Sequence, residues 1–246
     1  MEPTILVISF SIIIVAGFIQ GLVGFGSGLV SVPLLSLMFG PKFVVPLTLV
    51  HGLMMNMYLS VRNRRYLQWK RVLPLLLSGM AGIPIGALVL IMIPSDGLKV
   101  IMGVVISVFA VVLLSGIRRK FRREKTALLP VGFSSGVLNG SISMSGPPVI
   151  LFLSNQGVGK RRFRANIVTY FFLLNIVTLI TFLAAGILTE DVLITAVILL
   201  PPLPIGIIAG EALSGRVSEK LFRTIALLLV LGTGITALVT GLIALS

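Results

Sequence analysis

The fold is decided by two stretches of sequence, Gln20-Gly-Leu-Val-Gly-Phe-Gly-Ser-Gly28 and Asn139-Gly-Ser-Ile-Ser-Met-Ser-Gly-Pro-Pro148, each of which interrupts a long apolar run. Glycine and proline break helices, and inside a bilayer such a break is tolerated only where protein covers it or where it lines a wet cavity. We expect a new short helix after each break, because Pro147 and Pro148 suit a first helical turn and Ser145 suits the capping position before it.

The composition around these breaks is that of a membrane protein. The chain has 246 residues, of which 57% are hydrophobic and 11% charged, whereas a soluble domain carries about 25% charged residues. Its apolar stretches reach the roughly 20 residues that a helix needs to cross a bilayer. The first stretch has no basic residue ahead of it, so we expect a structural helix rather than a cleaved signal.

Several functions are excluded by composition. The chain has no cysteine and one histidine, which argues against disulfides, thiolate chemistry and a metal centre, and we predict no cofactor. The net charge of +13 comes mainly from four clusters that lie between apolar stretches. The clusters are Arg62–Arg71, Arg118–Lys125, Lys160–Arg164 and Arg216–Arg223. This placement indicates cytoplasmic loops under the positive-inside rule rather than a nucleic-acid surface; lipid-headgroup binding is the weaker alternative.

The clusters predict two sets of three spans with opposite orientations. The spans are expected at 44–61, 72–93, 98–117, 165–186, 192–210 and 224–245. A broken or re-entrant helical hairpin precedes each set, at 4–38 and 127–154, and the first is long enough for two pieces of about 15 residues. We therefore predict an all-α polytopic membrane protein with two inverted repeats, 1–120 and 126–246, in a single membrane domain.

Residue matches between the halves support the repeat. Asn56 matches Asn175 at an offset of 119 residues, and Gly21 matches Gly136 at 115. Pro84-Ile85-Gly86 matches Pro204-Ile205-Gly206 at 120. Each match alone is weak, but their common order and similar offset favour a duplication.

The breaks also predict a binding site for an anion. The N-terminus of a helix carries unpaired N–H groups and about half a positive charge, so two such ends meeting near the midplane would hold an anion without a buried cation. No lysine or arginine is visible in the interior of the spans, although Lys99 stands at the start of 98–117. The residues expected at the site are Gly24, Phe25, Gly26, Ser27, Gly28, Ser31, Asn56, Asn139, Gly140, Ser141, Ser143, Ser145, Gly146, Pro147 and Asn175.

Alternatives remain for several of these residues. Small residues spaced four apart, such as Gly17 and Gly21, commonly serve helix packing alone. Asn56 and Asn175 would either line the site or hydrogen-bond between helices. His51 is a candidate proton carrier, although a hydrogen-bonded structural histidine is the commoner arrangement.

The two breaks resemble those of the TauE/SafE family of membrane permeases. The similarity lies in Gly21-Leu-Val-Gly-Phe-Gly-Ser-Gly28 with Val32-Pro33-Leu34, and in Gly136-Val-Leu-Asn-Gly140 with Gly146-Pro147-Pro148. Ser27 and Ser145 stand where the family usually has glycine. The resemblance covers nearly the whole chain and implies transport of sulfite, thiosulfate or an organosulfonate.

The residues predict a secondary transporter of a small oxyanion that works by alternating access, and the resemblance implies that the oxyanion contains sulfur; an anion channel of the same architecture is the alternative. An enzyme is disfavoured because paired catalytic groups are missing from the spans. The expected partners are the substrate anion and the lipid bilayer, with no nucleic acid, and the sequence allows a homo-oligomer. The expected location is a bacterial or archaeal cytoplasmic (inner) membrane.

Overall fold

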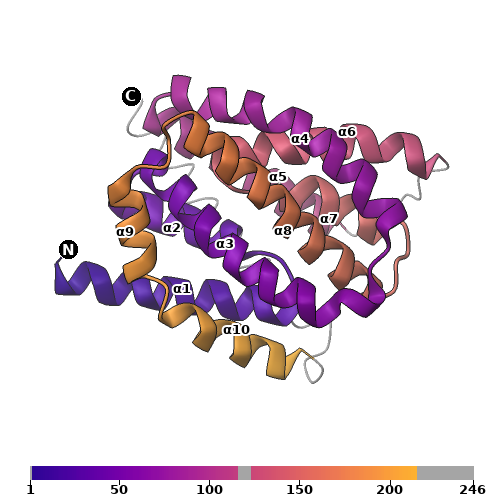
Figure 1. Cartoon of the computed structure of the whole chain (residues 1–246), viewed down its shortest axis with the longest axis horizontal. Coiled ribbons are helices and arrows are strands. Elements are labelled where there is room, and N and C mark those ends of the chain that lie inside the picture. The colour runs from indigo at the N-terminus through magenta and orange to yellow at the C-terminus, as the bar shows by residue number, and fades with distance from the viewer. Residues whose placement is uncertain (1, 116–122, 215–246) are drawn as a thin grey trace.

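The computed structural model describes residues 2–115 and 123–214 (Figure 1). Every regular element in these residues is helical, which confirms the prediction of an all-α protein. The elements are α1 (Pro3–Val23), α2 (Ser27–Phe39), α3 (Pro41–Asn63), the 3-10 turn η1 (Arg64–Tyr66), α4 (Trp69–Met92), α5 (Ser95–Leu114), α6 (Glu124–Ile142), α7 (Gly146–Asn155), α8 (Lys160–Ala184), α9 (Glu190–Ile198) and α10 (Pro202–Leu213).

Five of the described helices, α1, α3, α4, α5 and α8, are long and apolar enough to cross a membrane. The span expected at 192–210 is instead two helices, α9 and α10, bent by 54°. The bend falls at Pro201 and Pro202, which lack the N–H groups that would continue the helix. The hairpin at 4–38 consists of helices of 21 and 13 residues rather than two of about 15. The span expected at 224–245 lies outside the described residues.

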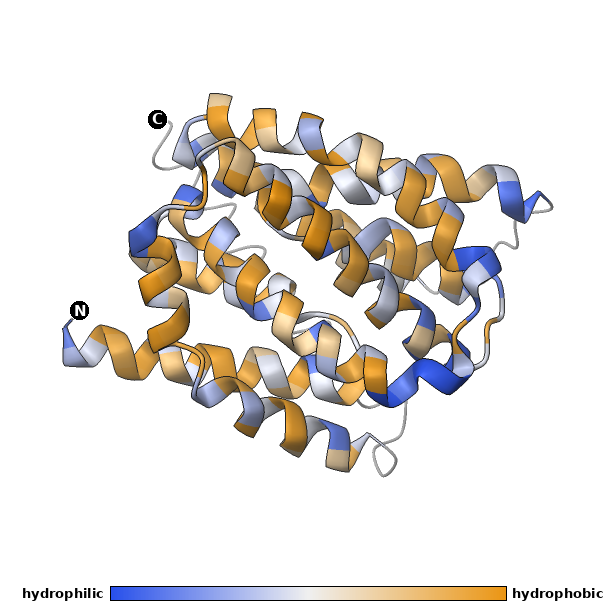
Figure 2. Cartoon of the chain, viewed as in Figure 1, coloured by the Kyte–Doolittle hydropathy of each residue, from blue (hydrophilic) through white to orange (hydrophobic). Residues whose placement is uncertain are grey.

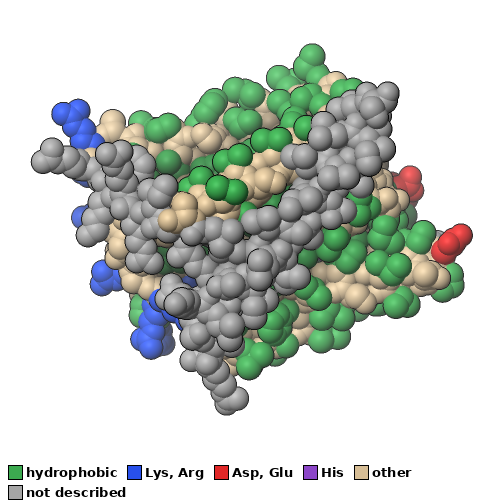
Figure 3. Space-filling view, turned by 180° about the vertical axis from the view of Figure 1, so that it is seen from behind, with side chains coloured by type: hydrophobic (Ala, Val, Ile, Leu, Met, Phe, Trp, Pro, Cys, Tyr) green, Lys and Arg blue, Asp and Glu red, His purple; other side chains and the backbone are tan. Residues whose placement is uncertain are grey.

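The surface of the molecule is that of a membrane protein. The helices are mostly apolar along their length and hydrophilic at their ends (Figure 2). On the face that Figure 3 shows, basic side chains lie at one end and acidic side chains at the other. Large apolar side chains more than half exposed include Val7, Leu77, Leu88, Met92, Val111 and Leu183. A soluble protein rarely exposes so much apolar surface. The chain is therefore an integral, multi-pass membrane protein.

Helices from the two halves of the chain cross at glycines. In the contact of α4 with α6, a Cβ on Gly136 would lie less than 3.0 Å from the backbone of Gly79. In the contact of α1 with α10, a Cβ on Gly206 would meet the backbone of Ile14 in the same way. Such crossings let backbones approach closely, which is the packing role that small residues have in membrane helices.

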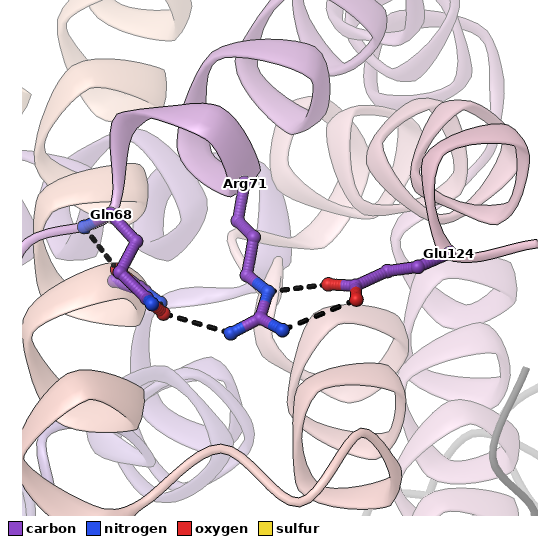
Figure 4. Close-up of polar contacts among 4 residues, drawn as sticks. Gln68, Arg71 and Glu124 are labelled. Atoms are coloured by element: carbon purple, nitrogen blue, oxygen red, sulfur yellow. Dashed lines mark hydrogen bonds and ion pairs between the residues drawn. The ribbon is translucent and has the colours of Figure 1, made fainter.

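A polar network closes the basic end of the bundle (Figure 4). The Arg71 guanidinium at the start of α4 binds both carboxylate oxygens of Glu124 at the start of α6. Its Nη1 donates to Gln68 Oε1 over 2.8 Å, and the Gln68 N–H donates to Asn166 Oδ1 on α8 over 2.8 Å. Three helices are thus fixed to one another beneath the basic loops.

Candidate functional site

The two helix breaks meet inside the bundle. Between α1 and α2 the chain turns through Gly24 and Gly26, which have positive φ angles of 93° and 102°. Between α6 and α7 it turns through Ser143, whose φ of 56° is unusual for a residue with a side chain. A Cβ on Gly28 would lie only 2.7 Å from the Ser143 carbonyl oxygen. The glycine at position 28 therefore allows the breaks to touch.

A cavity of about 50 Å³ lies where the breaks meet. The first turns of α2 and α7 border it, together with side chains from α1, α3, α6 and α8. The predicted site residues that the structure brings together around it are Gly26, Ser27, Gly28, Asn56, Asn139, Ser143, Ser145, Gly146 and Asn175. Ser145 precedes α7, but its side chain makes no capping hydrogen bond.

Other predicted site residues lie beside the cavity rather than on its wall. Phe25 packs edge-on against Phe163, with ring centroids 6.3 Å apart. The hydroxyls of Ser31 and Ser141 each donate to a carbonyl oxygen one turn back in their own helix, over 2.8 Å. Gly24 forms the left-handed turn after α1.

Three more predicted residues serve the surrounding packing. Gly140 lies against the backbone of α4, and Pro147 is buried in the first turn of α7. His51 is buried, and its Nε2 lies 2.9 Å from the carbonyl oxygen of Ala196 in the last turn of α9. The histidine thus contacts the helix that ends at the bend, not the cavity.

The sequence interpretation missed Gln20, the most connected side chain at the site. Its Nε2 donates to Asn56 Oδ1 over 2.7 Å and to the Gly24 carbonyl over 3.2 Å. Its Oε1 accepts the Ser27 N–H over 3.2 Å. One side chain therefore holds the end of α1, the start of α2 and the wall of α3. The sequence contained a signal for this role, because Gln20 is a polar amide in an apolar stretch and lies 119 residues before Asn139, the offset that also separates Asn56 from Asn175.

An equivalent amide pair lies on the other side of the cavity. Asn139 Nδ2 donates to Asn175 Oδ1 over 3.2 Å and to Thr178 Oγ1 over 2.8 Å. Both amide pairs are 36 residues apart in sequence. In both, the Oδ1 atom of the second residue accepts, which leaves the Nδ2 groups of Asn56 and Asn175 as donors at the cavity wall.

The remaining lining residues that the sequence did not single out are Leu29, Thr48, Gly52, Met144 and Phe171. The helices α3 and α8 contribute unequally. Gly52 on α3 and Phe171 on α8 are 119 residues apart, like Asn56 and Asn175, but the glycine leaves space and the phenylalanine fills it. A Cβ on Gly52 would lie 3.0 Å from Asn175 Nδ2. Apolar residues in uniformly apolar helices gave no sequence signal.

The chemistry of the cavity is that of neutral hydrogen-bond donors. Among the described residues, its lining contains amide, hydroxyl, backbone and apolar groups but no Asp, Glu, Lys, Arg or His. Helix N-termini from α2 and α7 add a partial positive charge. Within 2–115 and 123–214, no group of three or more His, Asp or Glu side chains could hold a metal ion. The arrangement suits a small anion.

The fold and this cavity define a polytopic membrane protein with a buried, donor-lined site between interrupted helices. A family model described as "Sulfite exporter TauE/SafE" matches residues 9–237. The chain belongs to this family, which confirms the resemblance found in the two breaks. Family membership implies a membrane transporter of sulfur-containing anions. A comparison with curated proteins and with solved structures gave no match.

Proposed function

We propose that this protein is a secondary transporter that moves a compact sulfur oxyanion by alternating access. The observation that carries the proposal is the uncharged, donor-lined cavity at the meeting point of two helix breaks. An anion there would accept hydrogen bonds from the first turns of α2 and α7 and from Asn56 and Asn175. The donors stand fixed by Gln20 and Asn139, so little reorganisation is needed on binding.

The size of the cavity favours sulfite or thiosulfate over an organosulfonate. A volume of about 50 Å³ leaves little space for a hydrocarbon chain beside the sulfur group. Leu29, Met144 and Phe171 supply the apolar part of the wall, and we expect a longer sulfonate to displace some of these side chains.

Alternating access is supported by the reciprocal packing of the two halves, which we propose are inverted repeats spanning 1–120 and 126–246. The first helix of each half packs on a helix of the other half, α1 on α10 and α6 on α4. The central helices α3 and α8 contact each other, and each carries one of the paired asparagines. Rocking of one half against the other about this contact would expose the cavity to each side in turn.

The test is flux of radiolabelled sulfite, thiosulfate and taurine into proteoliposomes containing the purified chain, with sulfate and chloride as competing anions. We expect sulfite or thiosulfate to move and Asn175→Leu to lower the rate at least tenfold, while the exposed-site variant Gly159→Ala transports normally. Failure of all three labelled anions to move or to stabilise the protein against heat would refute the proposal. Unitary currents far above carrier rates would identify a channel instead.

A further inference from the structure

Arg164 is a buried cation in the first turns of α8, just ahead of the span expected at 165–186. From sequence it belonged to the basic cluster Lys160–Arg164, taken as a cytoplasmic loop. The structure places that cluster in the first turns of α8, where Arg161 and Arg162 are exposed but Arg164 is only 9% exposed. The expected span 165–186 contains no arginine, but α8 begins earlier, at Lys160, and turns one charge of the basic cluster inward.

The guanidinium of Arg164 is only partly satisfied. Its Nη2 donates to the Gly21 carbonyl in the last turn of α1 over 2.5 Å. Its Nε is buried and has no hydrogen-bond partner among the described residues. None of the ion pairs found in 2–115 and 123–214 includes it. The carboxylate of Glu211 is already bound by Tyr58 and Arg62.

Arg164 forms no ion pair among the described residues, and the carboxylate of Glu211 acts on it only at longer range. Burying a charge is costly, and this interaction and the negative end of the α1 dipole offset only part of the cost. A group that brings negative charge to the free side of the guanidinium would complete the balance. The planar guanidinium has further N–H donors arranged to grip two oxygens of one anion.

The position of Arg164 relates this free side to the cavity. Arg164, Val168, Phe171 and Asn175 recur at helical spacing and therefore share one face of α8. Phe171 and Asn175 line the cavity, and Arg164 stands about 10 Å from Phe171 toward the basic end. Gly24 packs against this face of α8 beside Arg164 and Val168, since a Cβ there would be 2.9 Å from Arg164 Cγ and 3.2 Å from Val168 Cγ1.

We propose that Arg164 forms a second, transient site for the transported oxyanion, between the cavity and the basic face of the protein. This inference rests on the proposed transport function. The anion would pass along the Gly24 turn, and the Arg164 guanidinium would bind two of its oxygens before it enters the cavity or after it leaves. The residue 119 positions earlier is Val45, which is fully buried and apolar. The path on the opposite face would therefore lack an equivalent cation, and the two faces would differ in affinity.

The competing interpretation is that Arg164 only binds the end of α1 and stabilises the break. The experiment measures the KM for thiosulfate on each face separately, in right-side-out and inside-out membrane vesicles, together with the thermal midpoint. The variants are Arg164→Gln and Arg164→Lys. The control is Arg162→Gln, which removes the same charge from an exposed position in the same turn of α8.

We expect Arg164→Gln to raise the KM on the basic face at least tenfold and to change that on the other face less than twofold. Arg164→Lys keeps the charge and most of the stem, so it should fold even if the Gln variant does not. It should raise the basic-face KM severalfold because it cannot grip two oxygens. Arg162→Gln should leave both KM values unchanged.

Equal increases on both faces with a lower thermal midpoint would show a purely structural role and overturn the proposal. Unchanged KM values in both Arg164 variants would overturn it as well. A wild-type chain that moves no anion would refute the proposed function and this inference together. If the wild type transports normally but the Arg164 variants change the KM equally on both faces, only the role of Arg164 is refuted.

Discussion

Gly28→Ala tests whether the two helix breaks form the binding site together. A Cβ on Gly28 would lie 2.7 Å from the Ser143 carbonyl oxygen, whereas ordinary van der Waals contact begins at 3.4 Å. The first turn of α2 and the turn before α7 must therefore separate by about 0.7 Å to admit one methyl group.

The expected effect on stability is modest. Overpacking of this kind costs about 1–3 kcal/mol, and replacing glycine by alanine in a helix returns about 1 kcal/mol. The net loss is about 0–2 kcal/mol, which lowers the thermal midpoint by about 8 °C at most.

The expected effect on binding is larger than this change in stability implies. A separation of this size breaks a hydrogen bond to an anion held between the two turns, and such a bond contributes about 1.5–3 kcal/mol. The Kd for thiosulfate or sulfite should therefore rise roughly 10- to 150-fold.

The assay is titration of thiosulfate into the detergent-purified protein, followed by flux in proteoliposomes. Gly159→Ala is the matched control, because Gly159 is exposed and a Cβ there meets nothing within 4 Å. A folded Gly28→Ala protein with wild-type Kd and flux would show that the contact between the breaks does not shape the site.

Three further predictions follow from the same structure. Gly136→Ala should destabilise the protein by about 1–3 kcal/mol, because its Cβ would meet the backbone of Gly79; a thermal midpoint equal to that of wild type would contradict the close crossing of α4 and α6. His51→Gln should transport at the wild-type rate at about pH 6 and pH 8, since glutamine can still donate to the Ala196 carbonyl. A variant whose rate no longer changes with pH, where the wild-type rate does, would identify His51 as a proton carrier. Because no ionisable side chain of residues 2–115 and 123–214 lines the cavity, flux of a divalent anion should respond to an imposed membrane potential, at about 2.3 kcal/mol per charge per 100 mV; flux insensitive to potential would require a co-transported cation.

The helix breaks and the paired asparagines could be predicted because they are exceptions in an apolar chain. Gly26, Asn56 and Asn175 stand out against their neighbours, and the cost of polar groups in lipid forces such residues inward. The bend between α9 and α10 was also signalled by Pro201 and Pro202, but a proline in a membrane helix is compatible with a kink as well as a break.

The faces of the helices could not be predicted in the same way. Nearly every position of α8 between its basic start and its end is apolar or weakly polar, so the sequence does not tell which side faces a neighbour. Phe171 on the cavity wall and Leu183 on the lipid side are equivalent in hydropathy. Arg164 was missed for the opposite reason, because a charge among other charges gives no sign that it is buried.

The separation of charge from the cavity has a consequence for turnover. A carrier must release its cargo as readily as it binds it, and three hydrogen bonds from neutral donors to an anion contribute about 4.5–9 kcal/mol before the entropy lost on binding. Before that loss, the range corresponds to a Kd between about 0.3 μM and 0.5 mM, and the entropy cost makes the binding weaker than this. A guanidinium in the cavity would tighten binding and slow release, whereas Arg164, about 10 Å away, can raise the local concentration of anions without holding them at the central site.

We therefore expect a variant that brings a cation into the cavity, such as Gly52→Arg, to bind thiosulfate more tightly than wild type and to transport it more slowly. Looser binding, or binding and flux that rise together in a folded variant, would refute this account of why the cavity is neutral.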